Sequence, residues 1–199
     1  MIQQIGVVCQ DRISYGFLEG IRRRLRCDAQ LIEPTTGALG KSTTMTRRQA
    51  TLAARILRNN GAQLIIRFTD ADRNRWQDIK RREQAIFPDE VKSIVVCGVA
   101  VENTEQWLGL DRTYIEQRLG VVNAVKLTSA ELTGAVKNAI QRGRSPDEPV
   151  SEATARFVAE LPSDVFRKWL EKDDSLRAFY DECRKAALRE NCPVPNELD

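Results

Sequence analysis

The feature that most constrains the fold is an apolar run that stops on two carboxylates. Residues 64–72 read Leu-Ile-Ile-Arg-Phe-Thr-Asp-Ala-Asp, with Gly61 shortly before them and polar residues after them. A short apolar run bounded in this way predicts a buried strand of a parallel sheet. In open α/β sheets, ligands bind just outside the carboxyl ends of the strands. The sequence therefore places Asp70 and Asp72 at a binding edge.

These two aspartates have two competing interpretations. Side chains alternate along a strand, so Asp70 and Asp72 are expected to point the same way, with Ala71 opposite. Two carboxylates on one side repel each other unless a cation lies between them, and hard oxygen ligands suit Mg²⁺ or Mn²⁺. The alternative is that Asp-x-Asp merely ends a strand and caps the next helix. The residues alone leave both open.

Strand-like and helix-like segments alternate through the first hundred residues. Because that order is typical of a doubly wound sheet, we expect an α/β, Rossmann-like, mostly parallel sheet with helices on both faces. Apolar spacing predicts strands at 2–9, 64–68 and 93–100, a possible strand at 29–33, and helices at 15–26, 46–59 and 74–87.

The segment after this alternation has a different pattern. We expect the α/β domain to cover residues 1–120 and a helical C-terminal extension to cover 121–199. One short apolar pair, Val121-Val122, is a candidate edge strand. Four further helices are predicted at 128–142, 151–160, 163–171 and 174–190.

Composition excludes several classes of function. The 199 residues include no histidine, which rules out the common His-based catalytic schemes. Five cysteines without CxxC spacing indicate reduced thiols and make a zinc site improbable on spacing grounds. No apolar run approaches the ~20 residues that a membrane-spanning helix needs. We therefore expect a cytoplasmic protein without a membrane partner.

Charge is unevenly distributed along the chain. Residues 1–82 carry 16 Lys and Arg against 7 Asp and Glu, which leaves +9, whereas residues 83–199 carry 15 against 21, which leaves −6. A basic half around an acidic pair suits a phosphate-bearing partner. The basic run Arg22, Arg23, Arg24 and Arg26 is more simply interpreted as the solvated face of a helix.

A glycine-containing loop offers a second way to bind phosphate. Residues 35–43, Thr-Thr-Gly-Ala-Leu-Gly-Lys-Ser-Thr, resemble half of a P-loop, but Thr35 stands where the first glycine belongs. Gly40-Lys41-Ser42 would then mark a nucleotide-binding α/β protein. A basic loop covering a phosphodiester and a plain surface loop are the other interpretations.

A second acidic pair follows the strand predicted at 93–100. Glu102 and Glu105 are three residues apart, so they share one face if the segment is helical. Glu102 also lies just past a strand end, at the same edge as Asp70 and Asp72. The alternative is an ordinary first helical turn, where acids interact favourably with the helix dipole.

Taken together, three motifs resemble a Toprim-type domain over roughly residues 1–115. The resemblance is closest to small stand-alone proteins of the OLD and RloB kind, often encoded beside an ABC-type ATPase in phage-defence loci. Asp70 and Asp72 match the Asp-x-Asp of the family. Glu102 to Asp111 resembles its Glu-x-x-x-x-Trp-Leu-x-x-Asp helix. The glutamate at the end of the first strand is replaced by Gln10, with Asp11 beside it.

The resemblance implies a metal-dependent nuclease for DNA or RNA phosphodiesters. It also implies Mg²⁺ or Mn²⁺ as cofactor, a role as effector in anti-phage defence, and an ABC/AAA-type ATPase as protein partner. The alternative is a degenerate module that binds metal, nucleic acid or a protein without cleavage, because a glutamine cannot take a proton. The implied metal ligands are Asp70, Asp72 and Glu102. The implied catalytic residues are Gln10, Asp11, Glu102 and Glu105, and the implied phosphate-contacting cations are Arg12, Lys41, Arg73 and Arg75.

Overall fold

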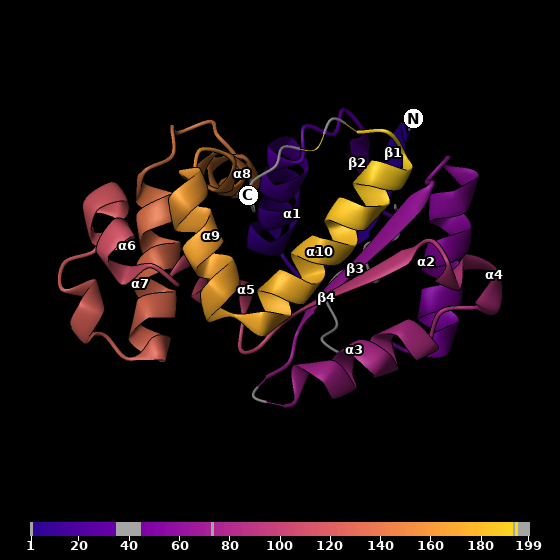
Figure 1. Ribbon diagram of the computed structural model, residues 1–199, viewed down its shortest axis with the longest axis horizontal. Helices are drawn as coiled ribbons and strands as arrows, with labels where there is room; N and C mark the ends of the chain where they lie inside the picture. Colours follow the sequence, from indigo (N-terminus) through magenta and orange to yellow (C-terminus); the bar gives the residue numbers. More distant parts are fainter. Residues whose placement is uncertain (1, 35–44, 73, 193, 195–199) are drawn as a thin grey trace.

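A four-stranded, all-parallel sheet forms the centre of the molecule. The computed structural model describes residues 2–34, 45–72, 74–192 and 194. Within them the strand order is β2-β1-β3-β4 (Figure 1). This arrangement confirms the expected α/β class with a parallel sheet. The strands are β1 Gln4–Val8, β2 Gln30–Ile32, β3 Leu64–Asp70 and β4 Val95–Ala100.

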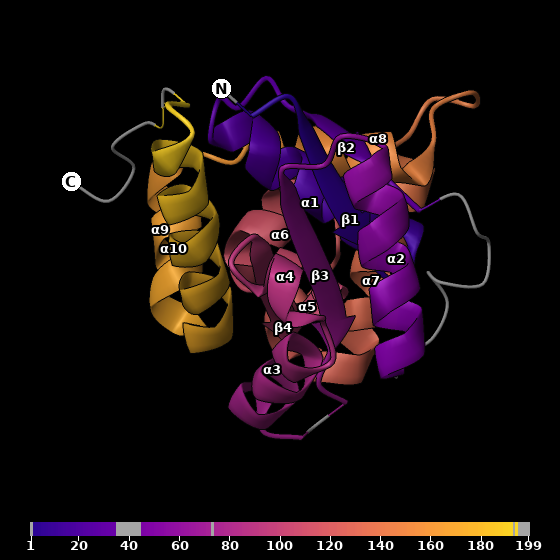
Figure 2. The ribbon, with the colours of Figure 1, turned by 90° about the vertical axis from the view of Figure 1, so that its right-hand side faces the viewer.

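Helices cover both faces of this sheet. One face packs on α1 (Arg12–Arg24) and α10 (Asp174–Arg189). The other face packs on α2 (Arg47–Asn59) and α3 (Trp76–Ala85). Figure 2 shows α10 and α2 on opposite sides of the strands. The strand sequence explains this layering, because alternate residues of β3 enter cores on opposite faces and nearly all of β3 is buried.

The connections reverse direction between β1 and β3. The helix that follows β1 is α1, on one face, whereas the helix that follows β3 is α3, on the other. The carboxyl ends of β1 and β3 therefore flank a topological switch point, which is where open α/β sheets bind their ligands. The register pairs Val8 with Arg67, and Asp70 with Ala100 of β4, so these three strands end at one edge.

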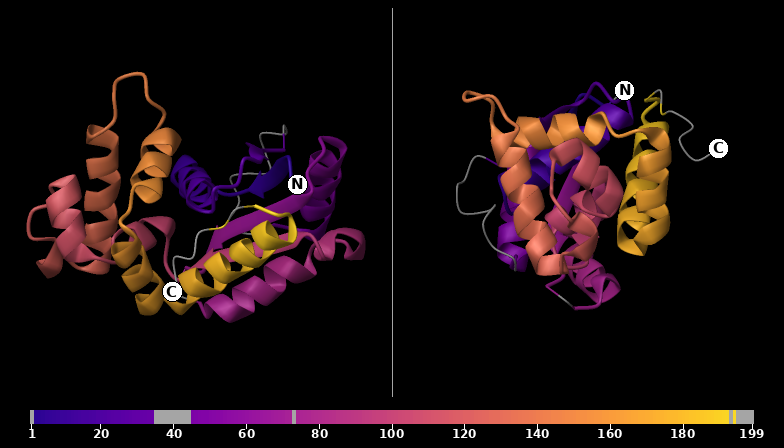
Figure 3. Two further views of the ribbon diagram at one scale, coloured as in Figure 1. Left: turned by 45° about the horizontal axis from the view of Figure 1, so that its top comes forward. Right: turned by 90° about the vertical axis from the view of Figure 1, so that its left-hand side faces the viewer.

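Helices α5 to α9 group at one end of the molecule, beside α1, whereas the short helix α4 lies near α2 (Figure 1 and Figure 3). The hydrophobic core continues across residue 120 into these helices, so α8 packs along α1 and α10 packs on β4. Here the two glycines of α1 are required: a Cβ at Gly16 would collide with the Ser151 carbonyl, and one at Gly20 would lie 2.5 Å from the Val158 Cβ. The bounds are α4 Asp89–Lys92, α5 Thr104–Leu108, α6 Arg112–Leu119, η1 Ala124–Lys126, α7 Ser129–Arg142, α8 Val150–Ala159 and α9 Ser163–Lys172.

The edge strand expected at Val121-Val122 is wrong. The sheet of the described residues contains no such strand, and Val122 is 79% exposed. Gly120 and Asn123 adopt left-handed backbone conformations, with φ of 64° and 56°. These two positions turn the chain on either side of the valines, so no extended segment forms. Over the part of the chain that the structure describes, no helix has the length and apolar character needed to cross a bilayer.

Two reduced cysteines lie in contact where the chain after α10 meets the turn after α1. The sulfur atoms of Cys27 and Cys192 are 3.0 Å apart and both residues are buried. Both cysteines are reduced, and burial raises the pKa of Cys192 to about 12. Alkaline conditions should therefore be needed to generate the attacking thiolate.

We expect this pair to form an intramolecular disulfide when the folded protein is treated with oxidised glutathione at alkaline pH. Two protein thiols would be oxidised and one glutathione disulfide reduced to two thiols. Thiol titration and peptide mass mapping should find two thiols lost and Cys27 linked to Cys192. A Cys192→Ser control should lose no pair of thiols, and a stable glutathione adduct in the wild type would contradict the expectation.

Candidate functional site at the carboxyl edge of the sheet

Asp70 ends β3 at the switch point and is the centre of the site. Its Oδ1 is buried and has no hydrogen-bond partner. Burial raises the pKa of Asp70 to about 7, and the negative charges of Asp11, Glu105 and Asp72 raise it further, in that order. Arg67 opposes this rise. The ionised form of Asp70 is therefore destabilised by its surroundings unless a positive charge joins them.

The first strand supplies Asp11 rather than Gln10 to this edge. The Nε2 of Gln10 donates a hydrogen bond to the Oγ1 of Thr69, at 2.8 Å. Asp11 is the N-cap of α1, and its Oδ1 accepts a hydrogen bond from the Ser14 backbone, also at 2.8 Å. The structure thus uses Gln10 to tie β1 to β3 and leaves the charge to Asp11.

Glu105 comes to the same place from α5. It is 8% exposed, and burial first, then the charge of Asp11, raise its pKa. The buried hydroxyls of Ser14 and Thr104 are 2.9 Å apart and hydrogen-bonded, so the first turns of α1 and α5 are held together. Trp107, fully buried, packs α5 onto the aromatic core with its ring centroid 5.4 Å from that of Phe68. These contacts fix Glu105 near Asp11.

Glu102 does not join this group. Its carboxylate accepts a hydrogen bond from the Nε2 of Gln106 at 2.6 Å, and its charge is not among the causes that shift the pKa of Asp70. The expectation that Glu102 and Glu105 share a helical face is wrong, because α5 begins only at Thr104. Asn103 caps that helix by accepting a hydrogen bond from the Gln106 backbone at 3.0 Å.

Asp72 lies outside the strand. Since β3 ends at Asp70, the alternation that was expected to align the two aspartates does not extend to Asp72. Asp72 has a left-handed φ of 49° and is exposed, whereas Ala71 is buried against α3. Asn74 closes the turn by donating from its side chain to the Ala71 carbonyl at 2.8 Å. Asp72 therefore influences Asp70 through charge, from the solvent side.

The carboxylates fit a divalent cation, although their side chains are not arranged as a finished ligand set. Among the described residues, no three Asp, Glu or Cys side chains form a ready metal cluster. The unpartnered Oδ1 of Asp70 is nevertheless a buried anionic oxygen, and Asp11 and Glu105 are the two charges that raise the Asp70 pKa most. Carboxylate oxygens are the donors that Mg²⁺ and Mn²⁺ prefer, so these three residues are the ones that could hold the ion.

Several cations lie around this acidic centre. Arg12 pairs with Glu33 at 2.6 Å and stays 64% exposed, whereas Arg75 is 81% exposed and 3.9 Å from Asp78. Lys137 of α7 lowers the pKa of Glu105, and no local sequence pattern predicts this effect because the two residues are about thirty positions apart. The proposed phosphate contacts Lys41 and Arg73, and the P-loop-like stretch 35–43, fall outside the described residues.

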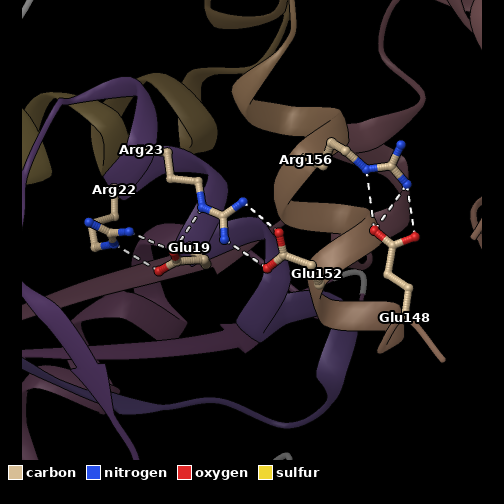
Figure 4. Close-up of polar contacts among 6 residues, drawn as sticks. All are labelled: Glu19, Arg22, Arg23, Glu148, Glu152 and Arg156. Atoms are coloured by element: carbon tan, nitrogen blue, oxygen red, sulfur yellow. Dashed lines mark hydrogen bonds and ion pairs between the residues drawn. The ribbon is translucent and has the colours of Figure 1, made fainter. Parts of the chain in front are cut away.

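An ion-pair network anchors α1, and with it Asp11 (Figure 4). Glu19 accepts hydrogen bonds from Arg22 at 2.6 Å and from Arg23 at 2.9 Å, and Arg23 also pairs with Glu152 of α8 at 2.7 Å. The interpretation of the basic run as a solvated face is wrong for Arg24, which is 6% exposed.

The buried position of Arg24 follows from the end of α8. Its Nη1 donates to the Leu161 carbonyl at 2.5 Å, and its guanidinium lies 4.3 Å from the centroid of the Phe166 ring. A helix C-terminus leaves carbonyls without partners, and a cation there is favourable. Arg23 and Arg24 therefore fix α1 against α8 and the residues that follow it, rather than serve the site directly.

The carboxyl edge of the sheet is the candidate functional site. It consists of three carboxylates, a set of surrounding cations, and a switch point between β1 and β3. No family model, curated protein or solved structure matches the chain.

Proposed function

We propose that this protein is a Toprim-like nuclease that hydrolyses DNA or RNA phosphodiesters with the help of a divalent cation. The observation that carries the proposal is the buried, unpartnered Oδ1 of Asp70 among the charges of Asp11 and Glu105. It lies at the carboxyl ends of β1 and β3, where a ligand of this fold class is expected. A cluster of carboxylates at such a place is stabilised by a cation that offsets their repulsion.

Each residue of the edge has a role that its environment supports. Asp70, Asp11 and Glu105 would hold Mg²⁺ or Mn²⁺, which when bound polarises a phosphoryl oxygen and stabilises the leaving oxygen. Burial raises the pKa of Glu105, and a bound cation would stabilise the ionised carboxylate that coordination requires. Arg75 and Lys137 would neutralise the phosphates on either side.

A module that binds metal and nucleic acid without cutting is the second candidate. It is favoured by Gln10, whose amide cannot take a proton and instead donates a hydrogen bond to Thr69. The proposed ATPase partner and the role in phage defence are supported by the family resemblance alone. Cleavage assays separate the two candidates, since both require the metal site and only the first requires turnover.

The matched pair Glu105→Gln and Glu102→Gln tests the site. We expect Glu105→Gln to weaken Mn²⁺ binding and to slow Mg²⁺-dependent cleavage by about 10- to 100-fold, because the site loses one anionic ligand. Glu102→Gln should resemble the wild type, because Glu102 contacts Gln106 and not the carboxylate centre. Calorimetry with Mn²⁺ and cleavage of labelled DNA and RNA strands measure both.

Three outcomes of this test are informative. Equal Mn²⁺ binding in the wild type and in Glu105→Gln would remove Glu105 from the site. A larger effect of Glu102→Gln would restore the ligand set that the sequence predicted. Glu105-dependent Mn²⁺ binding without cleavage of any strand by the wild type would favour the binding module.

A further inference from the structure

The solvent-exposed face of α2 carries four arginines and no acidic residue. The 36 residues from Pro34 to Thr69 contain no Asp or Glu. Within this acid-free segment, α2 exposes four arginines to solvent, and we name them the α2 stripe: Arg47, Arg48, Arg55 and Arg58.

Helical geometry gathers the α2 stripe on one side. At 3.6 residues per turn the four Cα positions fall within a sector of about 100°, and Arg47 to Arg58 span about 16 Å along the axis. The opposite side of α2 is buried on the sheet through Leu57 and three alanines. The arginines therefore point away from the protein as a continuous cationic ridge.

Within the described residues, no carboxylate forms an ion pair with the α2 stripe. The ion pairs recorded among the described residues all involve other side chains. The nearest acidic influence is Asp89, whose pKa is lowered chiefly by Lys92 and only slightly by Arg47. Arg48, Arg55 and Arg58 are left without a carboxylate partner in the part of the chain that is described.

We propose that the α2 stripe binds the sugar-phosphate backbone of a nucleic acid. The inference rests on the proposed function for the class of substrate, but not on the cleavage step. A ridge of about 16 Å matches roughly five phosphates of one strand, at 3.4 Å each along a duplex axis. The planar guanidinium group also pairs with phosphate through two parallel hydrogen bonds.

The position of α2 connects the stripe with the carboxyl edge. The α3–α4 segment packs into the same core as α2, through Phe87 and Val91. That segment begins at the turn after Asp70, next to the exposed Arg75. In Figure 2, α2 lies on the side of the strands opposite α10, and α3 and α4 lie next to the same strands. A nucleic-acid strand bound along the α2 stripe would therefore lie on the same face of the protein as α3, the helix that follows Asp70.

An acidic protein partner fits this surface less well. The cores of protein interfaces are apolar and depleted of charge. On the exposed face of α2 the large apolar side chain is Leu52, at 37% exposure, between charged and polar neighbours. Exposed cations with little apolar surface between them suit a uniform polyanion such as a sugar-phosphate backbone.

The test compares two triple variants that remove the same net charge. The first is Arg48→Gln, Arg55→Gln and Arg58→Gln in α2, which spares Arg47 because of Asp89. The control is Arg167→Gln, Arg177→Gln and Lys185→Gln, three exposed cations of α9 and α10. Glutamine keeps the helix propensity close to that of arginine and lysine, so both proteins should fold, which circular dichroism would check.

Binding is measured by fluorescence anisotropy with labelled duplex DNA, single-stranded DNA and single-stranded RNA, in chelator and over a range of salt. For at least one of the three probes, the α2 triple should lower the slope of log K against log salt by about 2 to 3, close to one per lost phosphate contact. The control triple should lower it by less than about 1. Equal slopes in the two triples for all probes would overturn the inference.

Two further arms separate this inference from the proposed nuclease function. Polyglutamate that competes as well as nucleic acid of equal charge, with the same dependence on the α2 triple, would overturn the assignment to nucleic acid. Asp70→Asn should keep stripe-dependent binding. If the wild type cleaves through Asp70 while the α2 triple binds normally, only the stripe assignment fails. If the stripe binds and no strand is cut, only the nuclease proposal fails.

Discussion

Replacing Asp70 with asparagine is expected to stabilise the metal-free protein and to abolish its response to Mg²⁺. Ionised Asp70 is destabilised by burial and by Asp11 and Glu105, so its neutral isostere removes that repulsion. A folded-state pKa of about 7, compared with the usual 3.8, corresponds to a gain of up to about 4 kcal/mol for the variant at pH 8. Urea denaturation in chelator, with and without added Mg²⁺, measures both effects.

Asp70 should make the free energy of unfolding of the wild type decrease as pH rises. The pKa of Asp70 is raised in the folded state, so the unfolded chain releases this proton first as pH increases. The folded state then binds more protons, and the stability of the wild type should fall between about pH 4 and pH 7 and level off above. Asp70→Asn should lose this component. In the wild type, saturating Mg²⁺ should recover it, because a bound cation stabilises the ionised carboxylate.

Two outcomes of the same experiment would contradict the prediction for Asp70. An Asp70→Asn variant that is less stable than the wild type in chelator would mean that Asp70 has a structural partner, against the unpartnered state of its Oδ1. An equal response of both proteins to Mg²⁺ would place the cation elsewhere. Asp164→Asn, a matched change at an exposed position of α9, should lower stability by less than about 1 kcal/mol and should leave the response to Mg²⁺ unchanged.

Breaking the buried ion pair beneath the edge is expected to have the largest destabilising effect. Arg67 of β3 and Glu83 of α3 are 1% and 0% exposed in their side chains and 2.8 Å apart. Removing one partner leaves the other charge buried and uncompensated, which costs about 3–5 kcal/mol. Glu83→Gln should therefore lower the free energy of unfolding by that amount in urea denaturation. The Nη1 of Arg67 also donates to the carbonyls of Val8 and Phe68, each at 3.4 Å, but these neutral acceptors do not offset its charge.

Two comparisons decide whether burial is the cause. Glu160→Gln breaks the exposed pair with Arg118, where the side chains are 48% and 54% exposed, and should cost less than about 1 kcal/mol. The double change Arg67→Met and Glu83→Leu should recover most of the loss, because apolar residues of similar volume need no partner. A double variant as unstable as Glu83→Gln would show that packing, and not charge, carries the effect.

Local sequence determined the elements and the position of Asp70. The run ending at Asp70 is apolar and bounded, so it forms a strand in any parallel sheet that can bury it. Two predicted helix starts are also local: the capping boxes of Thr46 with Gln49 and of Thr128 with Glu131 satisfy backbone groups within four residues. These interactions need no distant partner, which is why the sequence alone locates them.

The membership of the site was decided only by tertiary structure. Whether Glu102 or Glu105 faces Asp70 depends on where α5 begins, and that depends on the Asn103 cap and on how Trp107 packs in the core. Asn103 in turn accepts a hydrogen bond from Thr133 of α7, at 3.3 Å. Spacing along the chain could not distinguish the two glutamates, because both follow the same strand.

Long-range packing also decided which charges are free. Arg24 has the same local sequence context as its neighbours, yet the end of α8, more than 130 residues away, buries it. Lys137 reaches the electrostatic environment of Glu105 from a helix that the sequence assigned to an appended extension. Composition and periodicity record which charges a chain has, whereas burial and partners, which set their pKa and their availability, exist only once distant segments pack together.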